Sequence, residues 1–301
     1  AKLEAGLVYH DYPQILSRKS SVNPNYWDWR DINYSLNYTR NDHVFGLSST
    51  TTAGWTSTQH LQAGARTYKG SKDLGILQKD VKYDGSFDHV FSLGNDLGLT
   101  DNLYLATGVS AIQIKRNVKV TFSDRPNTSG LPSQYLYDEW RFAPRIGLRY
   151  YIAPDVQLFG NVSRTIDPPS SWSISGSGVT SNYTKPLVPQ TANTVEFGIK
   201  GKYGIFDGSL AFYKSWIHNE LLNVQVLPAT ATTAAVVSTS NATPTIHQGI
   251  EAGLSTRLWE GDNGDTLTWR QAYTLNDFHY KNDPLFKKNE LPGLPKHIYQ
   301  A

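Results

Sequence analysis

An alternation of apolar and cationic residues between Trp140 and Ile152 most constrains how this chain folds. Every even position in that segment is apolar, whereas Arg141, Arg145 and Arg149 stand at odd positions. A β-strand points successive side chains to opposite faces, so the segment has one apolar face and one cationic face. A helix would mix the two sets. The pattern therefore predicts a strand whose apolar face lies in apolar surroundings and whose other face is wet.

The same period of two recurs along the chain, and no amphipathic helical stretch of comparable length interrupts it. Further alternating segments cover residues 32–39, 195–203, 250–258 and 266–275. Most of the expected strands run about 10–15 residues, longer than the five or six usual in soluble sheets. A tilted strand that crosses a bilayer needs roughly 9–11 residues. A soluble sheet with one wet face is the alternative for any single strand, but these lengths favour membrane-spanning strands.

The connections between the expected strands alternate between short and long. The short ones are rich in Asp, Asn, Gly or Pro and fall at Asn41-Asp42, Thr100-Asp101-Asn102, Ala153-Pro154-Asp155, Gly204 to Gly208 and Glu260 to Asp265. The long ones cover residues 13–28, 58–81, 123–138, 167–190, 225–244 and 281–295. Short turns on one rim and long loops on the other are typical of outer-membrane barrels. The sequence predicts an all-β fold, an antiparallel transmembrane β-barrel, with short turns in the periplasm.

Residues 55–70 alternate as well, with Leu61, Ala63 and Ala65 against Gln62 and Arg66. An additional strand here would break the alternation of rims. We therefore assign the stretch to a loop or to a strand extension, which leaves about 12 strands, within the range of known membrane barrels.

Composition excludes several other classes of protein. The chain is 39% hydrophobic with a mean hydropathy of −0.43, which excludes a bundle of membrane helices. Aromatic residues make up 12%, led by 18 Tyr and 8 Trp, as expected for a barrel with aromatic girdles. The net charge of +2 is too small to indicate a nucleic-acid partner, and the absence of Cys excludes disulfides and thiolate metal sites.

No pattern of catalytic residues is present. The eight His residues never fall at metal-ligand spacing, and the chain has no phosphate-binding Gly loop and no Gly-x-Ser-x-Gly motif. We therefore expect no enzyme activity, no catalytic residue, no metal site and no cofactor.

Several short motifs follow one another in a recognisable order. They are Arg141 to Leu148, Leu187-Val188-Pro189-Gln190-Thr191 followed by Val195-Glu196-Phe197-Gly198, His247-Gln248-Gly249-Ile250-Glu251, and Leu291 to His297 with its Leu-Pro-x-x-Pro-x-His pattern. Over roughly residues 83–300 the chain resembles the barrel of TonB-dependent outer-membrane receptors, which import ferric siderophores, cobalamin and similar ligands. Gln190 stands where that family usually has Glu.

The resemblance implies a barrel of about 22 strands, of which this chain would supply about 12. We expect residues 1–301 to be part of one outer-membrane β-barrel domain, without the plug domain and the terminal strands. The implied function is TonB-energised import of a ferric siderophore or a similar metal chelate across the Gram-negative outer membrane. The alternatives are import of another bulky ligand, such as a quinone cofactor, copper or cobalamin, or a passive porin-like barrel. The implied partners are outer-membrane lipid, the ferric chelate, and the TonB complex through an N-terminal region outside this chain.

Aromatic and cationic residues near the external rim are the candidates for ligand contact, because they suit a flat anionic chelate. They are Arg116, Arg125, Tyr135, Tyr137, Arg141, Trp172 and Tyr183. The alternative is that the loop aromatics pack the loops together or sit in the girdle. Trp140 and Trp269 we assign to the girdle or the lipid face.

Charged residues on the polar face of the strands are the candidates for the barrel lumen. They are Arg145, Arg149, Glu196, Lys200, Glu251, Arg257 and Arg270. An Arg facing lipid at mid-bilayer would cost about 2–4 kcal/mol, so these side chains are expected to point inward and to contact a plug domain. The alternative is pairing along the wall, such as Glu251 with Lys200 or Arg270.

Overall fold

The computed structural model describes residues 1–16, 25–69, 76–124, 134–175, 187–227 and 236–301. Apart from one five-residue helix, the regular elements of these residues are strands. No helix among them is long and apolar enough to cross a membrane. The elements are β1 (Lys2–Leu16), β2 (Asn25–Val44), β3 (Leu47–Lys69), β4 (Ile76–Lys82), β5 (Phe87–Gly98), β6 (Leu103–Ser123), β7 (Gln134–Ala153), β8 (Val156–Asp167), α1 (Ser171–Ser175), β9 (Gln190–Tyr203), β10 (Phe206–His218), β11 (Leu221–Leu227), β12 (Val236–Asn241), β13 (Thr245–Glu260), β14 (Thr266–Tyr280) and β15 (His297–Gln300).

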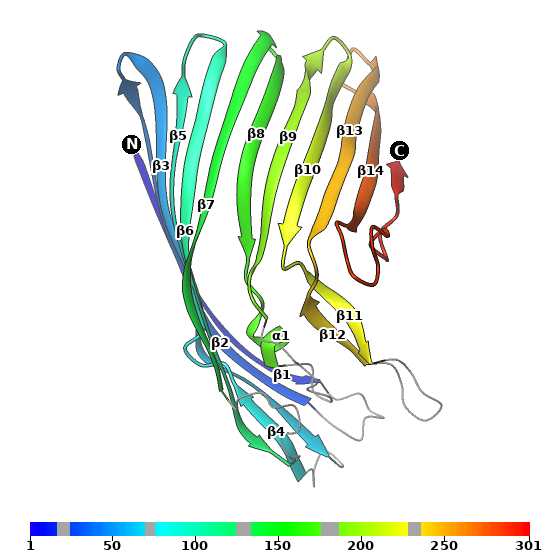
Figure 1. Ribbon diagram of the computed structural model, residues 1–301. Coiled ribbons are helices and arrows are strands. Elements are labelled where there is room, and N and C mark those ends of the chain that lie inside the picture. Colours follow the sequence, from blue (N-terminus) through cyan, green and yellow to red (C-terminus); the bar gives the residue numbers. More distant parts are fainter. Residues whose placement is uncertain (17–24, 70–75, 125–133, 176–186, 228–235) are drawn as a thin grey trace.

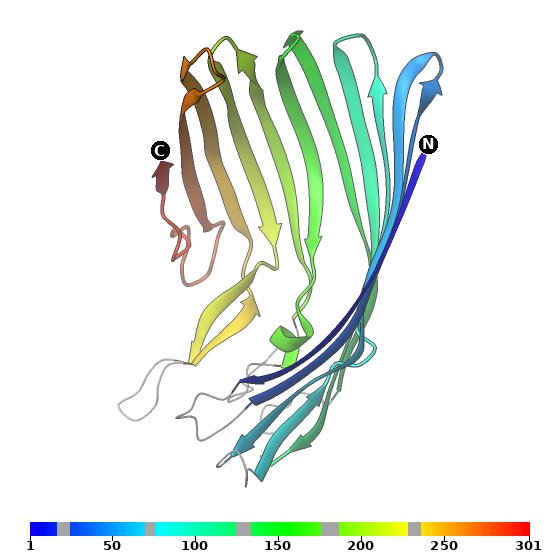
Figure 2. The same cartoon turned by 180° about the vertical axis from the view of Figure 1, so that it is seen from behind.

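Thirteen of these strands form one antiparallel sheet in the order β1-β2-β3-β4-β6-β7-β8-β9-β10-β13-β14-β15, in which β5 also pairs with β3 and β6. Because β4 and β5 both lie between β3 and β6, they share one position, and the sheet has 12 positions. The sheet bends into a curved, open wall with β1 and β15 at its two edges (Figures 1 and 2). The predicted antiparallel barrel, partial and with about 12 strands, is confirmed.

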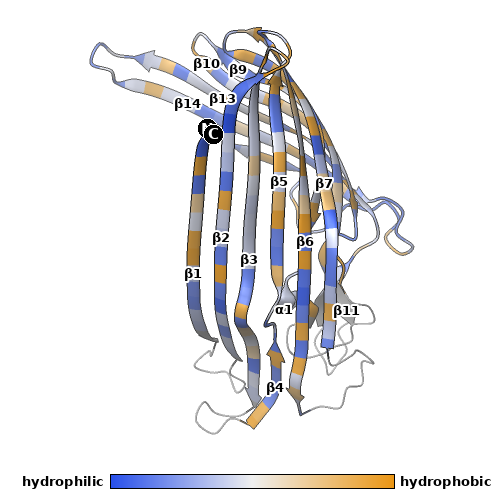
Figure 3. Ribbon diagram, turned by 90° about the vertical axis from the view of Figure 1, so that its left-hand side faces the viewer, coloured by the Kyte–Doolittle hydropathy of each residue, from blue (hydrophilic) through white to orange (hydrophobic). Residues whose placement is uncertain are grey.

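The two faces of the wall differ as the alternation predicts. On β7 the apolar side chains of Trp140, Leu148 and Ile152 are each about half exposed (48%, 48% and 52%), whereas Arg141 and Arg149 on the other face are partly buried. The alternation is visible as bands along the strands in Figure 3. Register partners in neighbouring strands share a face, so the apolar face continues from Leu148 to Leu105 on β6 and, through Gly160, to Phe197 on β9. We call this apolar face the outward face of the wall and the opposite face the inward face.

The short connections gather at one rim of the wall, at the top in Figure 1. They lie within residues 45–46, 99–102, 154–155, 204–205 and 261–265. The predicted turn at Asn41-Asp42 is wrong: β2 continues through it to Val44, with Asn41 opposite Thr50. The turn is made instead by Phe45 and Gly46, whose φ angles of 53° and 80° are those of the mirror-image turns that hairpins favour.

The opposite rim carries the long connections, but strand structure extends further into it than predicted. The stretch predicted as a loop over residues 58–81 is largely the end of β3 and all of β4, so of the two assignments for residues 55–70 the strand extension is confirmed. The extension is held by a hydrophobic cluster of Ala63, Ala65, Val81, Tyr83 and Val118. The predicted loop 225–244 likewise includes the end of β11 and all of β12, which form a two-stranded hairpin.

Introducing one cation on each face tests the assignment of faces. Leu148→Arg puts a charge on the outward face about six residues from the short turn, and should cost about 2–4 kcal/mol if that face meets lipid. Asn161→Arg puts the same residue at a similar depth on the inward face, beside Glu196, and should be tolerated. Urea unfolding of the full-length protein in lipid vesicles measures the free energy of unfolding of both variants. Equal losses for the two variants would contradict the assignment.

Candidate functional site

The long connection between β8 and β9 folds onto the inward face of the wall at the external rim. Ile174 of α1 packs against the hydrophobic cluster of the β3–β4–β6 extension. The carbonyl of Leu187 accepts a hydrogen bond from the Tyr135 hydroxyl at 3.0 Å. Arg116 holds the carbonyl of Pro169. The two described ends of this connection, residues 168–175 and 187–189, are therefore bound to β6 and β7.

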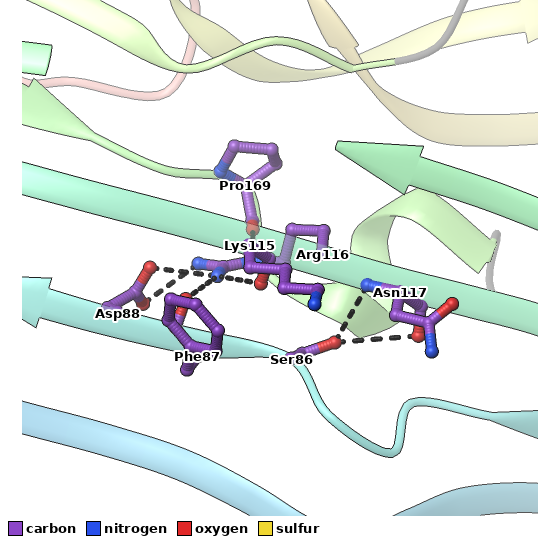
Figure 4. A network of polar contacts seen from close by, with 7 residues as sticks. All are labelled: Ser86, Phe87, Asp88, Lys115, Arg116, Asn117 and Pro169. Atoms are coloured by element: carbon purple, nitrogen blue, oxygen red, sulfur yellow. Dashed lines mark hydrogen bonds and ion pairs between the residues drawn. The ribbon is translucent and has the colours of Figure 1, made fainter. Parts of the chain in front are cut away.

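Arg116 on β6 is the centre of this attachment (Figure 4). Its guanidinium makes a two-pronged ion pair with Asp88, at 2.8 Å and 2.9 Å, and its Nε donates to the Pro169 carbonyl at 2.7 Å. Nη1 also donates to the carbonyls of Phe87 and Lys115. The residue is only 6% exposed. Arg116, a candidate ligand contact from the sequence, is thus occupied in positioning the connection.

Tyr135, Tyr137 and Arg141 lie along the same face of β7. The two Tyr rings are stacked, with centroids 6.5 Å apart and an interplanar angle of 8°. The Arg141 guanidinium donates to the Tyr137 hydroxyl at 3.3 Å and pairs with Glu139. Both partners of that pair remain partly exposed, at 39% and 43%. The structure therefore brings together three of the predicted ligand contacts as an accessible aromatic and cationic surface.

The other three predicted ligand contacts cannot be placed on this surface. Arg125 and Tyr183 lie outside the described residues. Trp172 is in α1, and its side chain is outside the described part. Their contact with a ligand stays a prediction.

Deeper in the wall, Arg149 and Arg145 have different surroundings. Arg149 pairs with Asp96 of β5 and lies over the ring of Tyr104, 5.3 Å from its centroid. Arg145 lies across two glycines: a Cβ on Gly108 would stand 2.7 Å from its Nε, and one on Gly94 3.4 Å from its Nη2. The register puts Gly94, Gly108 and Arg145 in one row. Arg145 makes no ion pair with any described residue and is exposed, so its cation faces the concave side without a partner.

The register places the remaining lumen candidates on the inward face as well. Glu196 accepts a hydrogen bond from Asn161 at 2.8 Å, Lys200 lies 6.0 Å from the centroid of Phe159, and Arg257 pairs with Glu260 at 2.7 Å. Within the described ranges, no ion pair joins Glu251 to Lys200 or Arg270. Whether these residues contact a plug stays a prediction.

Sequence reasoning missed a second polar contact at the external rim, centred on Glu220 between β10 and β11. Glu220 is 7% exposed; Thr245 donates to its carboxylate, and Nε2 of His247 lies 3.2 Å from it. Burial alone would raise the pKa of the Glu220 carboxyl, but His247 and Thr245 together outweigh it and hold the pKa below its usual value. The His-x-Gly-x-Glu motif contains His247, but nothing local in the sequence pairs it with a residue 27 positions earlier.

No group of three or more His, Asp or Glu residues arranged to hold a metal ion occurs among the residues that the structure describes. The described inward face carries charged, hydrogen-bonding and aromatic side chains. The sheet is a curved antiparallel wall with an apolar outward face and a charged inward face, and its connections are short on one rim and long on the other. These features define a membrane-spanning β-barrel of the bacterial outer membrane.

Comparison with known proteins identifies the family. The model of the TonB-dependent receptor-like β-barrel matches residues 2–301, so the chain belongs to the barrel portion of that family. Its fold is similar to the alcaligin outer-membrane receptor FauA from Bordetella pertussis, with 19% identity, 99% of this chain and 46% of that chain covered, and a TM-score of 0.63. It is also similar to the ferripyoverdine receptor of Pseudomonas aeruginosa, with 17% identity, 99% and 40% covered, and a TM-score of 0.62.

The copper transporter OprC is a further relative in fold, with 13% identity, 92% of this chain and 44% of that chain covered, and a TM-score of 0.64. No curated protein matches the sequence. The chain spans less than half the length of these solved structures. The family is one of transport receptors rather than enzymes, and its barrels lie in the Gram-negative outer membrane.

The attachment by Arg116 can be tested by hydrogen exchange. Arg116→Gln leaves the Asp88 carboxylate without its cation. The expected cost is on the order of 2–3 kcal/mol, below the value for fully buried pairs because Asp88 is 30% exposed. Amides of residues 168–175 should then exchange faster in the full-length protein. Arg141→Gln, which breaks a more exposed pair, is the control and should leave that segment unchanged. Unchanged exchange in Arg116→Gln would show that other contacts hold the connection.

Acid should loosen the contact around Glu220. A carboxyl whose pKa is lower in the folded state stabilises that state above its unfolded pKa of about 4.3, and this contribution is lost as pH falls through the lower folded value. Exchange of residues 219–223 and 239–245, corrected for its intrinsic pH dependence, should therefore rise below about pH 4. Glu220→Gln should remove this rise, whereas Glu290→Gln, in the exposed pair with Lys296, should retain it. A rise that survives in Glu220→Gln would assign the effect to another group.

Proposed function

We propose that this chain is part of the barrel of a TonB-energised receptor that imports a ferric siderophore or a similar metal chelate. Two facts support the proposal: the family to which the chain belongs, and the similarity of its fold to receptors for ferric chelates. The observation that carries it is the surface formed by Tyr135, Tyr137 and Arg141 on the inward face near the external rim. Aromatic faces and a cation suit a flat, anionic chelate.

Under this proposal the ligand stacks on the exposed side of the Tyr pair, and its negative charge pairs with the Arg141 guanidinium. The present partner of Arg141 is Glu139 on its own strand, in a half-exposed pair. Exposed pairs contribute little, so an anionic ligand displaces that carboxylate at small cost. Trp172, Arg125 and Tyr183 are proposed to add to this surface from the loops.

The deeper inward charges are proposed to contact a plug domain, with residues 1–301 as part of one barrel domain. Arg145 is the best placed of them, because it is exposed on the inward face and makes no ion pair with any described residue, while Gly94 and Gly108 leave room for its side chain. Arg149 is already neutralised by Asp96. A plug carboxylate opposite Arg145 would form a stronger pair than one in water, because the plug itself would exclude part of the water from the pair.

Import of copper is the second candidate, because the copper transporter OprC shares the fold over 92% of this chain. At 13% identity this similarity shows the fold alone. A bare copper ion calls for nitrogen or sulfur ligands, and the described residues hold no cluster of that kind. A chelated metal therefore fits the surface better.

Uptake by living cells tests the function. Iron-starved Gram-negative cells that carry the full-length protein should accumulate a panel of radio-iron siderophores only when TonB is functional. Arg141→Gln should weaken surface binding of the imported chelate, most at low salt, because a partly exposed cation acts through a screened field. Arg145→Gln should leave surface binding intact and raise leakage of small solutes. Uptake of the whole panel that does not require TonB would refute the proposal in favour of a passive pore, and accumulation of copper instead of iron would favour the second candidate.

A further inference from the structure

Two cations lie on the outward face of the wall, on the opposite side from the surface proposed to bind the imported ligand. Along β8, β9 and β10 the outward side chains are apolar up to Val162, Val195 and Phe212, as seen from their register. The next outward positions toward the external rim are Arg164 on β8 and Lys214 on β10. Asn193 and Val195 of β9 lie between these two cations. Both cations therefore lie on the side of the wall that faces lipid.

Neither cation is neutralised by the protein. The Nε of Arg164 donates to the Asn193 side chain at 2.9 Å, and its two terminal nitrogens have no partner among the described residues. The Nζ of Lys214 lies 5.6 Å from the centroid of the Trp216 ring and makes no ion pair within the described ranges. The outward positions of these strands beyond the apolar belt carry no carboxylate; they are Arg164, Ile166, Thr191, Asn193, Lys214, Trp216 and His218.

The nearest outward carboxylate across the sheet belongs to Asp277 on β14, in the same register row as Lys214 but two strands away. It accepts a hydrogen bond from Gln248 at 2.6 Å and also contacts His279. Lys115 on β6 offers a contrast. It too lies over an aromatic ring, that of Phe87, but its register partner is Asp138, which supplies a negative charge beside it.

The depth of the two cations follows from the cost of charge in lipid. An Arg or Lys on the lipid face costs about 2–4 kcal/mol at mid-bilayer and about 0–1 near the interface. Arg164 and Lys214 stand at the external end of the apolar belt, and Trp216, an aromatic of the kind enriched at interfaces, stands next to Lys214. This places them at the level of the headgroups of the external leaflet.

We propose that Arg164 and Lys214, with Asn193 between them, bind the phosphate group of a lipid in the external leaflet. Two strand spacings across and two residues along separate their Cα atoms by roughly 12 Å. Two long side chains from such positions reach a common anion between them. The terminal guanidinium nitrogens match phosphate oxygens, and the ammonium adds a point charge. The acyl chains then lie on Val162, Val195 and Phe212 below. This inference rests on the membrane placement alone and is independent of which ligand the receptor imports.

Lipid titration of the full-length protein tests the site. The protein is purified in detergent, stripped of lipid, and titrated with diphosphoryl lipid A while bound lipid is counted by native mass spectrometry. The double variant Arg164→Gln/Lys214→Gln should lose about tenfold or more in affinity, since each charge-assisted contact contributes more than a neutral one. Lys214→Arg, which keeps the charge, should bind as the unmodified protein does. Lys202→Gln removes the same charge from the inward face of β9 and should also bind normally.

Three further measurements distinguish a site for lipid phosphate from a site for free phosphate and from no site at all. Inorganic phosphate at the same concentration should not displace the lipid, because it lacks the acyl chains; full displacement would overturn the lipid assignment in favour of a free anion site. Dephosphorylated lipid A should bind as weakly to the unmodified protein as intact lipid A does to the double variant. Equal binding of lipid A by the double variant and the unmodified protein, both folded by circular dichroism, would refute the site.

Discussion

The requirement that every backbone N–H and C=O in a bilayer be paired inside the protein governs the rest of this structure. Water is absent from the hydrocarbon layer, so a chain that crosses it as strands must pair each strand on both sides. The 13-stranded antiparallel sheet meets that requirement for every strand between its two edges, β1 and β15. Once the backbone groups are paired in this way, the sequence of each strand determines which of its two faces meets lipid. The separation of apolar side chains from the charged side chains of the inward face follows from which face meets lipid.

Because the period of a strand is two, neighbouring residues have opposite roles. Lys200 and Lys214 are the same residue type on adjacent strands, yet the register puts the first on the inward face and the second on the outward face. The inward cation is available to water or another protein segment, and the outward one only to the membrane surface. A shift of register by one residue would exchange all such pairs at once, which is why the pairing is so strongly specified.

The same period explains what could be predicted from the sequence. The faces of β7 and the position of Arg141, Arg145 and Arg149 follow from the alternation, and the number of strands follows from it together with the short and long connections. Features that depend on contacts distant in sequence do not follow. Arg116 looks like any cation near a loop, and its partners Asp88 and Pro169 are 28 and 53 residues away. The turn at Phe45-Gly46 was missed because Asn41-Asp42 has the stronger turn composition, whereas pairing with β3 decides where β2 ends.

The attachment by Arg116 also bears on how an external ligand would be met. A binding surface built from loose loops must lose conformational freedom when the ligand arrives, and that loss weakens binding. Here the described ends of the β8–β9 connection are fixed to the wall by Arg116 and Tyr135, and Tyr135 is itself one of the stacked pair beside Arg141. The hydroxyl of Tyr135 is used for the attachment while its ring remains stacked on Tyr137. One residue thus joins the connection to the proposed ligand surface, so that the surface is formed before the ligand binds.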